Sequence, residues 1–157
     1  MTKFYKNMSY DRALEKAKWY CSFQERSRLD LEQRFFAWHV AKSDWDKIIS
    51  YLIDENYFNE TRFVEAYVRG KFRIKKWGRN KIILGLLQKK ISNKLINEAI
   101  HREIEEEEYL QMINELIDKK IQLINESDEL KKRDKIYRYL ISKGYESELV
   151  ANELNSI

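Results

Sequence analysis

The protein has 157 residues, of which 43% are hydrophobic and 13% aromatic, and its formal net charge is +4. This composition provides enough apolar surface for a folded core and excludes a chain that is disordered as a whole. The sequence has no proline and only four glycines, and no apolar run is long enough to cross a bilayer. Sheets and hairpins need turn residues that are missing here, so we predict an all-α protein without a membrane span.

Apolar residues recur at helical spacing along the whole chain, and polar residues or glycines separate the periodic segments. We predict nine helices, at about 9–22, 27–38, 44–55, 60–76, 79–90, 93–103, 105–124, 129–143 and 146–155. Side chains suited to capping a helix N-terminus precede four of them: Ser9, Ser27, Asn59 and Ser92. Gly78 is expected to stop the fourth helix, and Gly144 to end the eighth in a left-handed conformation. The fourth helix is predicted to bury Phe63, Ala66, Tyr67, Gly70, Ile74 and Trp77.

An internal repeat organises these helices. Residues 79–96 resemble residues 133–150 without a gap, 54 positions later, and a fainter copy lies 51 positions upstream. The first matched position of each copy is an arginine: Arg28, Arg79 and Arg133. A period of about 50 residues indicates one helical unit used three times. We therefore expect a tandem array of three three-helix repeats, at 1–57, 58–104 and 105–157.

The charge of the chain is unevenly distributed. Residues 62–94 contain eleven Lys or Arg and one acid, Glu65, whereas residues 95–134 contain six Lys or Arg and twelve acids. Clustered cations neutralise phosphates, and aromatic side chains among them can stack on unpaired bases. The basic segment therefore predicts a polyanionic partner such as single- or double-stranded DNA, bound through its phosphates. The acidic run Glu105–Glu108 predicts either a solvated helix start or a surface for a basic partner.

Arg62, Arg69, Arg73 and Lys76 are predicted to form one stripe on the fourth helix, with Phe72 and Trp77 interleaved among the cations. The candidate residues for contact with nucleic acid or a nucleoprotein filament are Arg62, Arg69, Lys71, Arg73, Lys75, Lys76, Trp77, Arg79 and Lys81. A helix-turn-helix is a weaker alternative. Its reading helix at 93–103 would carry only Lys94 and Arg102 as cations, which is unusual for major-groove recognition.

No pattern of catalytic residues is present. The sequence has no glycine-rich phosphate loop or nucleophile motif, and His39 and His101 have no companion ligands, so we expect no catalytic residue, metal, cofactor or small-molecule substrate. Cys21 is the single cysteine, which excludes an intrachain disulfide and agrees with a reducing cytoplasm.

Several segments together resemble the RecX family of regulatory proteins. They are YFNETRFVEAYV at 57–68, KWGR at 76–79, Ile82 with Leu86, KKIS at 89–92, Leu95-Ile96 and Ala99, and the upstream Ser27-Arg28 with Leu31. Glu60 and Arg79 depart from the family pattern, where Asp and Pro are frequent. The resemblance implies an elongated, curved array of three-helix repeats in a bacterial cytoplasmic protein. It also implies binding in the groove of the RecA–DNA filament, with inhibition of the ATPase and strand exchange of the RecA recombinase.

Two other functions remain open from the sequence. The basic segment also suits a general nucleic-acid-binding module that has no recombinase partner. The acidic third repeat also suits a helical scaffold for protein–protein contacts.

Overall fold

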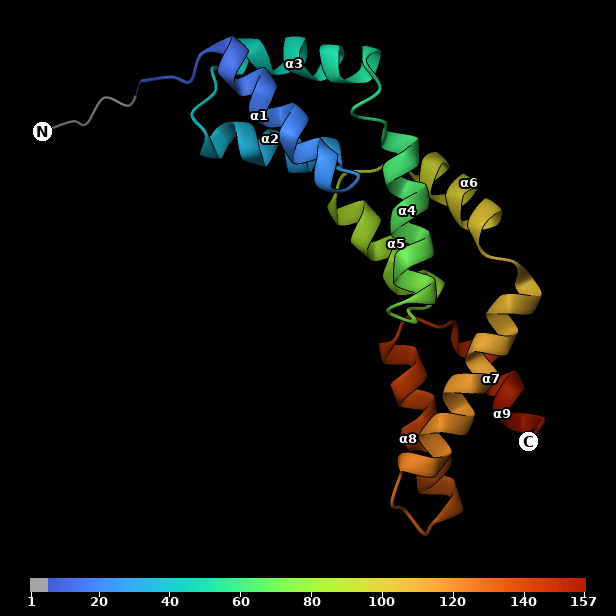
Figure 1. The fold of residues 1–157 in the computed structure, drawn as a ribbon. Coiled ribbons are helices and arrows are strands. Elements are labelled where there is room, and N and C mark those ends of the chain that lie inside the picture. Colours follow the sequence, from blue (N-terminus) through green and yellow to red (C-terminus); the bar gives the residue numbers. More distant parts are fainter. Residues whose placement is uncertain (1–5) are drawn as a thin grey trace, which may run out of the picture. The chain divides into compact units, whose positions relative to one another are not determined.

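The computed structural model describes residues 6–157, which fold into nine α-helices and no β-strand (Figure 1). The helices are α1 (Tyr10–Phe23), α2 (Arg28–Ala37), α3 (Lys42–Asp54), α4 (Glu60–Arg73), α5 (Arg79–Gln88), α6 (Asn93–Glu103), α7 (Glu106–Leu123), α8 (Glu129–Ser142) and α9 (Ser147–Asn155). The all-α prediction is confirmed for these residues. Ser9, Ser27 and Ser92 accept hydrogen bonds from the first turns of α1, α2 and α6, as their sequence positions predict.

The chain divides into two compact units, the first ending at Ala66 and the second spanning Tyr67–Ile157. In the first unit α3 packs against α1 and α2. Its core consists of Ala13, Ala17, Tyr20, Leu31, Phe35, Val40, Ile48, Ile49, Leu52 and Phe58. Ser27 is fully buried, and it can be buried because its hydroxyl and backbone N–H form a reciprocal capping box with Asp30.

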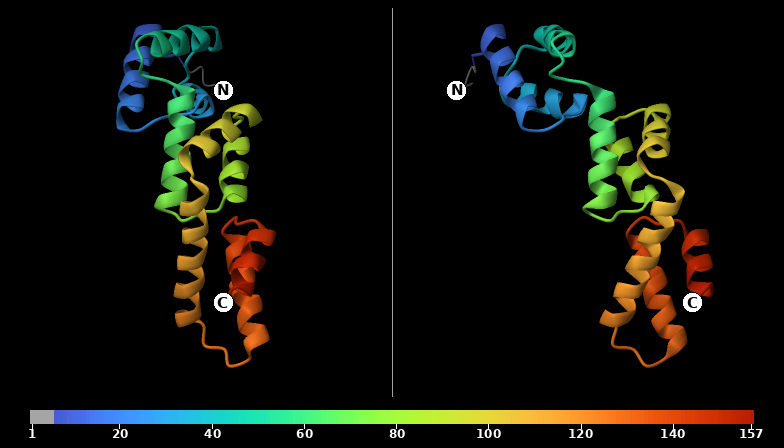
Figure 2. Two further views of the ribbon diagram at one scale, coloured as in Figure 1. Left: turned by 90° about the vertical axis from the view of Figure 1, so that its right-hand side faces the viewer. Right: turned by 45° about the vertical axis from the view of Figure 1, so that its right-hand side comes forward.

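The second unit contains the remainder of α4 and helices α5–α9. Helix α5 packs against α6, and α7, α8 and α9 pack against one another. Both views in Figure 2 show α7 and α8 side by side, joined by the loop at residues 124–128. A row of buried aromatic rings connects α4 to the later helices: the Phe72 ring centroid lies 5.8 Å from that of Tyr109, which lies 5.3 Å from that of Tyr145.

Three helix ends share a backbone conformation. His39, Lys90 and Gly144, which follow α2, α5 and α8, have φ values of 60°, 62° and 101°. Their separations of 51 and 54 residues are those of the sequence repeat. In each case the next residue donates its N–H to the carbonyl five positions earlier, as in Val40 to Phe35. This pattern closes a helix in the way that left-handed C-terminal caps do. The repeat boundaries at residues 57/58 and 104/105 stay a prediction.

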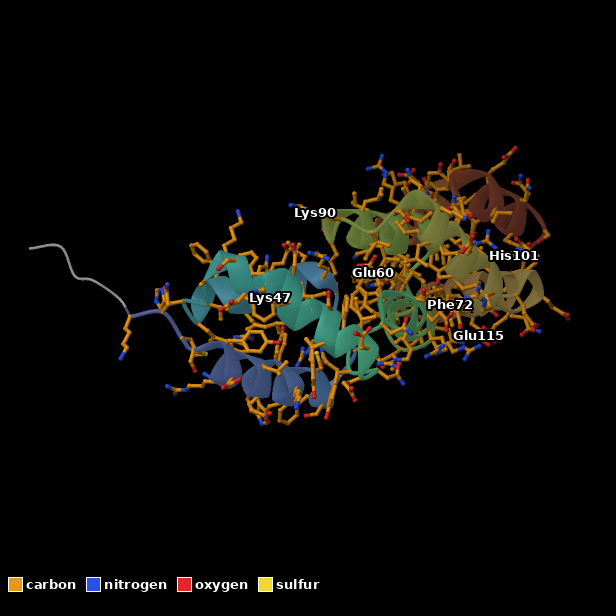
Figure 3. All side chains as sticks on the ribbon, turned by 90° about the horizontal axis from the view of Figure 1, so that it is seen from above. Lys47, Glu60, Phe72, Lys90, His101 and Glu115 are labelled. Carbon is orange, nitrogen blue, oxygen red and sulfur yellow. The ribbon has the colours of Figure 1, made fainter. Side chains whose placement is uncertain are left out.

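The buried face of α4 differs from the predicted one. Val64, Val68 and Phe72 are fully buried, whereas Ile74, which was expected inside, is 78% exposed. Figure 3 labels Phe72 among the packed side chains of the second unit. The prediction that Phe72 is available for base stacking is therefore wrong. Residues 64, 68 and 72 lie four apart and form one stripe, and the helix ends at Arg73, so Ile74 and Trp77 never join its face.

Candidate functional site

The segment after α4 is a tight turn rather than more helix. Lys76 has a φ of 59°, and the Trp77 N–H donates to the Lys71 carbonyl oxygen at 2.9 Å. The predicted end of the helix at residue 76 is thus three residues too late. Lys76 consequently does not belong to an α4 stripe with Arg62, Arg69 and Arg73, because the backbone has already left the helix.

All four arginines among the candidate residues form ion pairs within the protein. In the first unit, Arg62 Nε lies 2.8 Å from a Glu25 carboxylate oxygen, and its guanidinium also donates to the Asn56 side chain. In the second unit, Arg69 lies 3.0 Å from Glu103 and Arg73 lies 3.4 Å from Glu108. Exposed pairs of this kind contribute about 0–1 kcal/mol to stability. Their main effect is to neutralise positive charges that the sequence predicts to be available for a nucleic-acid or filament partner.

Arg79 is held more firmly than the other three. Its guanidinium donates to Glu146 at 2.9 Å and to Glu106 at 2.7 Å, and it lies 3.9 Å from the centre of the Tyr109 ring. Burial alone would lower the pKa of Arg79, but the hydrogen bond that Arg79 donates to Glu146 and the nearby charges raise it. The Tyr109 hydroxyl accepts the Arg79 backbone N–H and donates to Glu146. Arg79 therefore ties α5 to α7 and α9.

The acidic run belongs to this network. Glu106, Glu107 and Glu108 occupy the first turn of α7, where carboxylates are favoured by the helix dipole, as the helix-start interpretation predicts. Two of the three also pair with arginines, Glu106 with Arg79 and Glu108 with Arg73. Part of the acidic block thus neutralises part of the basic block.

The lysines behave differently from the arginines. None of Lys71, Lys75, Lys76 and Lys81 forms an ion pair with a carboxylate among residues 6–157. The ammonium groups of Lys71 and Lys81 lie 4.7 and 4.6 Å from the centre of the Trp77 ring. Trp77 is half-buried, and cation–π contacts of this kind fix long side chains near an aromatic face. The structure therefore brings Lys71 and Lys81 together over Trp77, and Lys75 and Lys76 lie on the backbone of the turn between them.

A fifth lysine, which the sequence did not single out, joins them from the α8–α9 turn. Lys143 Nζ donates to the Lys75 carbonyl oxygen at 2.9 Å, and the Tyr145 hydroxyl donates to the Lys76 carbonyl oxygen at 2.9 Å. In the opposite direction, the Gly78 N–H donates to the Lys143 carbonyl oxygen at 2.8 Å. We call the set Lys71, Lys75, Lys76, Lys81 and Lys143 the lysine cluster. The sequence signals near this residue were Gly144, a predicted helix end, and the internal repeat, which pairs Lys143 with Lys89; neither indicated a contact with the basic turn.

Glycines permit the close approach of these two turns. A Cβ on Gly78 would lie 2.4 Å from the backbone of Gly144 and of Tyr145, and a Cβ on Gly144 would lie 2.4 Å from Lys81 Cβ. The Asn80 N–H donates to the Gly144 carbonyl oxygen at 2.9 Å across the same contact. The N–H groups of Arg79 and Asn80, the first two of α5, are therefore already satisfied by the protein. Any anion at this site has to be bound by lysine side chains instead.

No group of three or more His, Cys, Asp or Glu side chains is placed to hold a metal ion within residues 6–157. Within the same residues, no helix combines the length and the apolar character that crossing a membrane requires.

Comparison with known proteins identifies the family. Residues 59–100 match the model of the second three-helix domain of RecX, and residues 106–152 match that of the third. The chain is 34% identical over 114 residues to the regulatory protein RecX of Clostridium tetani, covering 71% of this chain and 51% of that protein. It is 31% identical over 152 residues to the regulatory protein RecX of Streptococcus uberis, covering 94% and 55%.

The chain thus spans about half the length of the curated relatives it matches. Among solved structures, RecX from Lactobacillus salivarius superimposes with a TM-score of 0.83 at 22% identity, over 94% of this chain and 95% of that one. At that identity the superposition supports the fold, while the two consecutive domain matches support the family. With nine helices among residues 6–157, both domain models in order and relatives named as regulatory proteins, the chain belongs to the RecX family.

Proposed function

We propose that this protein regulates homologous recombination by binding the RecA–DNA filament and suppressing the ATPase and strand-exchange activities of the RecA recombinase. Its family membership and the regulatory role in the names of its relatives support this proposal. The protein acts by binding rather than by catalysis, and it works in the cytoplasm, where the recombinase and its DNA are found.

The lysine cluster is the observation that carries the DNA part of the proposal. Two of its ammonium groups lie over Trp77, a third is bonded to the Lys75 carbonyl oxygen, and none of the five lysines forms an ion pair with a carboxylate among the described residues. Unpaired cations held this close attract a polyanion and raise its local concentration. In this proposal Lys71, Lys75, Lys76 and Lys81 contact phosphates. Trp77 positions two of them, because both of its neighbouring ammonium groups already lie over the ring.

The arginines play a secondary part. Arg62, Arg69, Arg73 and Arg79 reach a phosphate only if they exchange their present carboxylate partners. Arg79, which has two carboxylates and a ring contact, is the least available of the four. We assign it to holding the second unit together.

The direct test measures ATP hydrolysis by RecA on single-stranded DNA while the purified protein is added. We expect hydrolysis to fall as the protein approaches the concentration of the recombinase. The doubly substituted variant Lys76→Gln/Lys81→Gln should inhibit less than the matched control Lys119→Gln/Lys131→Gln, whose lysines are exposed on α7 and α8. Unchanged hydrolysis at several-fold excess of the wild type refutes regulation of RecA. Equal inhibition by the two variants refutes the role of the cluster.

A second candidate function, a nucleic-acid-binding module without a recombinase partner, rests on the same lysines. Tight binding to bare DNA together with no effect on RecA would favour it. The scaffold alternative has less support, because Glu103, Glu106 and Glu108 already pair with arginines of the same unit.

A further inference from the structure

Lys143 contributes a positive charge to the basic turn from a distant part of the sequence. The α8–α9 turn docks on residues 75–80 through four hydrogen bonds. In two of them the acceptors are the carbonyl oxygens of Lys75 and Lys76. The Lys143 ammonium group is one of the four donors, at 2.9 Å from its acceptor. Its position is therefore fixed by the fold rather than left to a free side chain.

The environment of Lys143 is unfavourable for a positive charge. Burial lowers the pKa of Lys143, and the positive charges of Lys81 and Lys76 lower it further. No carboxylate among residues 6–157 forms an ion pair with any of these three lysines. The neighbouring arginines, in contrast, each have a carboxylate partner. A folded protein that leaves three adjacent cations without a counter-charge gives up stability, and such local conflicts are concentrated at functional sites.

We propose that Lys143 completes, with Lys76 and Lys81, a binding site for a backbone phosphate of a polynucleotide. This inference deepens the proposed function, because it assigns the ligand chemistry of one part of the lysine cluster. The site reads charge and not sequence, since ammonium groups are compact point charges without the planar fork with which arginine recognises a base or a phosphate.

A polynucleotide suits this site better than a small anion. Lys71, in the last turn of α4, and Lys75, in the turn that follows it, add positive charge beyond the three lysines that hold one phosphate. A chain of phosphates can meet all of them at once, whereas an isolated anion can neutralise only its immediate neighbours. The α5 N-terminus, the usual protein site for a small oxyanion, is closed by Tyr109 and Gly144.

The decisive experiment measures how the affinity for fluorescein-labelled oligo(dT) depends on salt concentration, without RecA. Lys143→Gln keeps a hydrogen-bond donor for the Lys75 carbonyl oxygen but removes the charge. We expect it to reduce the slope of log K against log[salt] by about 0.7, equivalent to roughly fivefold weaker binding at 0.1 M salt. Lys143→Arg should retain most of the slope. Lys119→Gln removes the same charge on α7, ten residues beyond Tyr109 and about 15 Å along the helix, and should leave the slope unchanged.

A second measurement separates phosphate binding from a purely structural role. The pKa of the Lys143 ammonium group, followed by NMR, should rise when oligo(dT) is added, because a phosphate supplies the missing negative charge. Adding inorganic phosphate at the same concentration of phosphate groups should neither raise this pKa as much nor displace the oligonucleotide.

Three results would overturn the inference: an unchanged slope for Lys143→Gln, an unchanged pKa with DNA, or equal competition by inorganic phosphate. The ATPase assay with RecA is a separate measurement. A regulator that inhibits RecA but shows an unchanged Lys143→Gln slope would retain its proposed function and lose this site.

Discussion

The space beside Gly70 and Gly78 predicts opposite effects on stability when each is replaced by alanine. Gly70 lies within α4, and a Cβ there would meet nothing within 4 Å. Gly78 has a φ of −79°, which any residue can adopt, but its Cβ would lie 2.4 Å from the carbonyl carbon of Gly144 and from the backbone nitrogen of Tyr145. Gly78 is therefore required for space alone, and Gly70 is not required at all.

The magnitudes follow from these distances. Gly70→Ala should raise the free energy of unfolding by about 0.5–1 kcal/mol, because alanine is the better helix former. Gly78→Ala should lower it by about 2–4 kcal/mol. Overpacking against rigid backbone costs about 1–3 kcal/mol. Separating the turns also weakens the hydrogen bonds from Gly78 and Asn80, each contributing about 1 kcal/mol.

Urea denaturation followed by far-ultraviolet circular dichroism measures both effects. In thermal melting, the Tm of the Gly78→Ala variant should be lower than that of the wild type by roughly 6–12 °C. The two variants control for each other, since each adds one methyl group to a glycine, at Gly70 within α4 and at Gly78 immediately before α5. A Gly78→Ala protein as stable as the wild type would show that the α5 and α8–α9 turns do not touch as described. A destabilised Gly70→Ala would contradict the open space beside α4.

Three further predictions concern single side chains. Phe72→Ala should destabilise the protein by about 3–5 kcal/mol and Ile74→Ser by less than about 0.5 kcal/mol, measured by urea denaturation; a larger effect at Ile74 would restore the buried face predicted from sequence. Tyr109→Phe should cost about 1–3 kcal/mol in the same assay, because the Arg79 N–H and the Glu146 carboxylate both lose a buried partner, and a neutral result would contradict this network. Burial raises the pKa of the Cys21 thiol to about 11, against the effect of nearby arginines, so its alkylation by iodoacetamide should still accelerate between pH 9 and 11; a rate already level at pH 9 would contradict this burial.

The pKa of Cys21 also affects stability. Well below pH 9, the ordinary pKa of a thiol, Cys21 is protonated in both the folded and the unfolded state. The stabilisation that its protonated form gives to the folded state is therefore fully present there. Stability then decreases as pH rises from about 9 to about 11, because the unfolded state releases the proton first.

Local sequence patterns determined the helices and most of their ends. Apolar spacing of three and four residues predicted nine helices, and the side chains of Ser9, Ser27 and Ser92 cap the helices that they precede. Gly144 ends α8 in the left-handed conformation that its position predicts. These features depend on interactions between residues no more than five apart, so a sequence contains the information directly. The family resemblance was available from the same residues and is confirmed.

Only the tertiary structure decided which charges are available to a partner. Arg69 and Arg73 are neutralised by glutamates 34 and 35 residues away, and Lys143 joins the basic turn from 68 residues beyond Lys75. The early end of α4 depends on the turn at Lys76, whose carbonyl oxygen is bound by Tyr145, 69 residues later. A local count of charges cannot distinguish a paired arginine from an unpaired lysine, because the partner is selected by packing between helices that are distant in the chain.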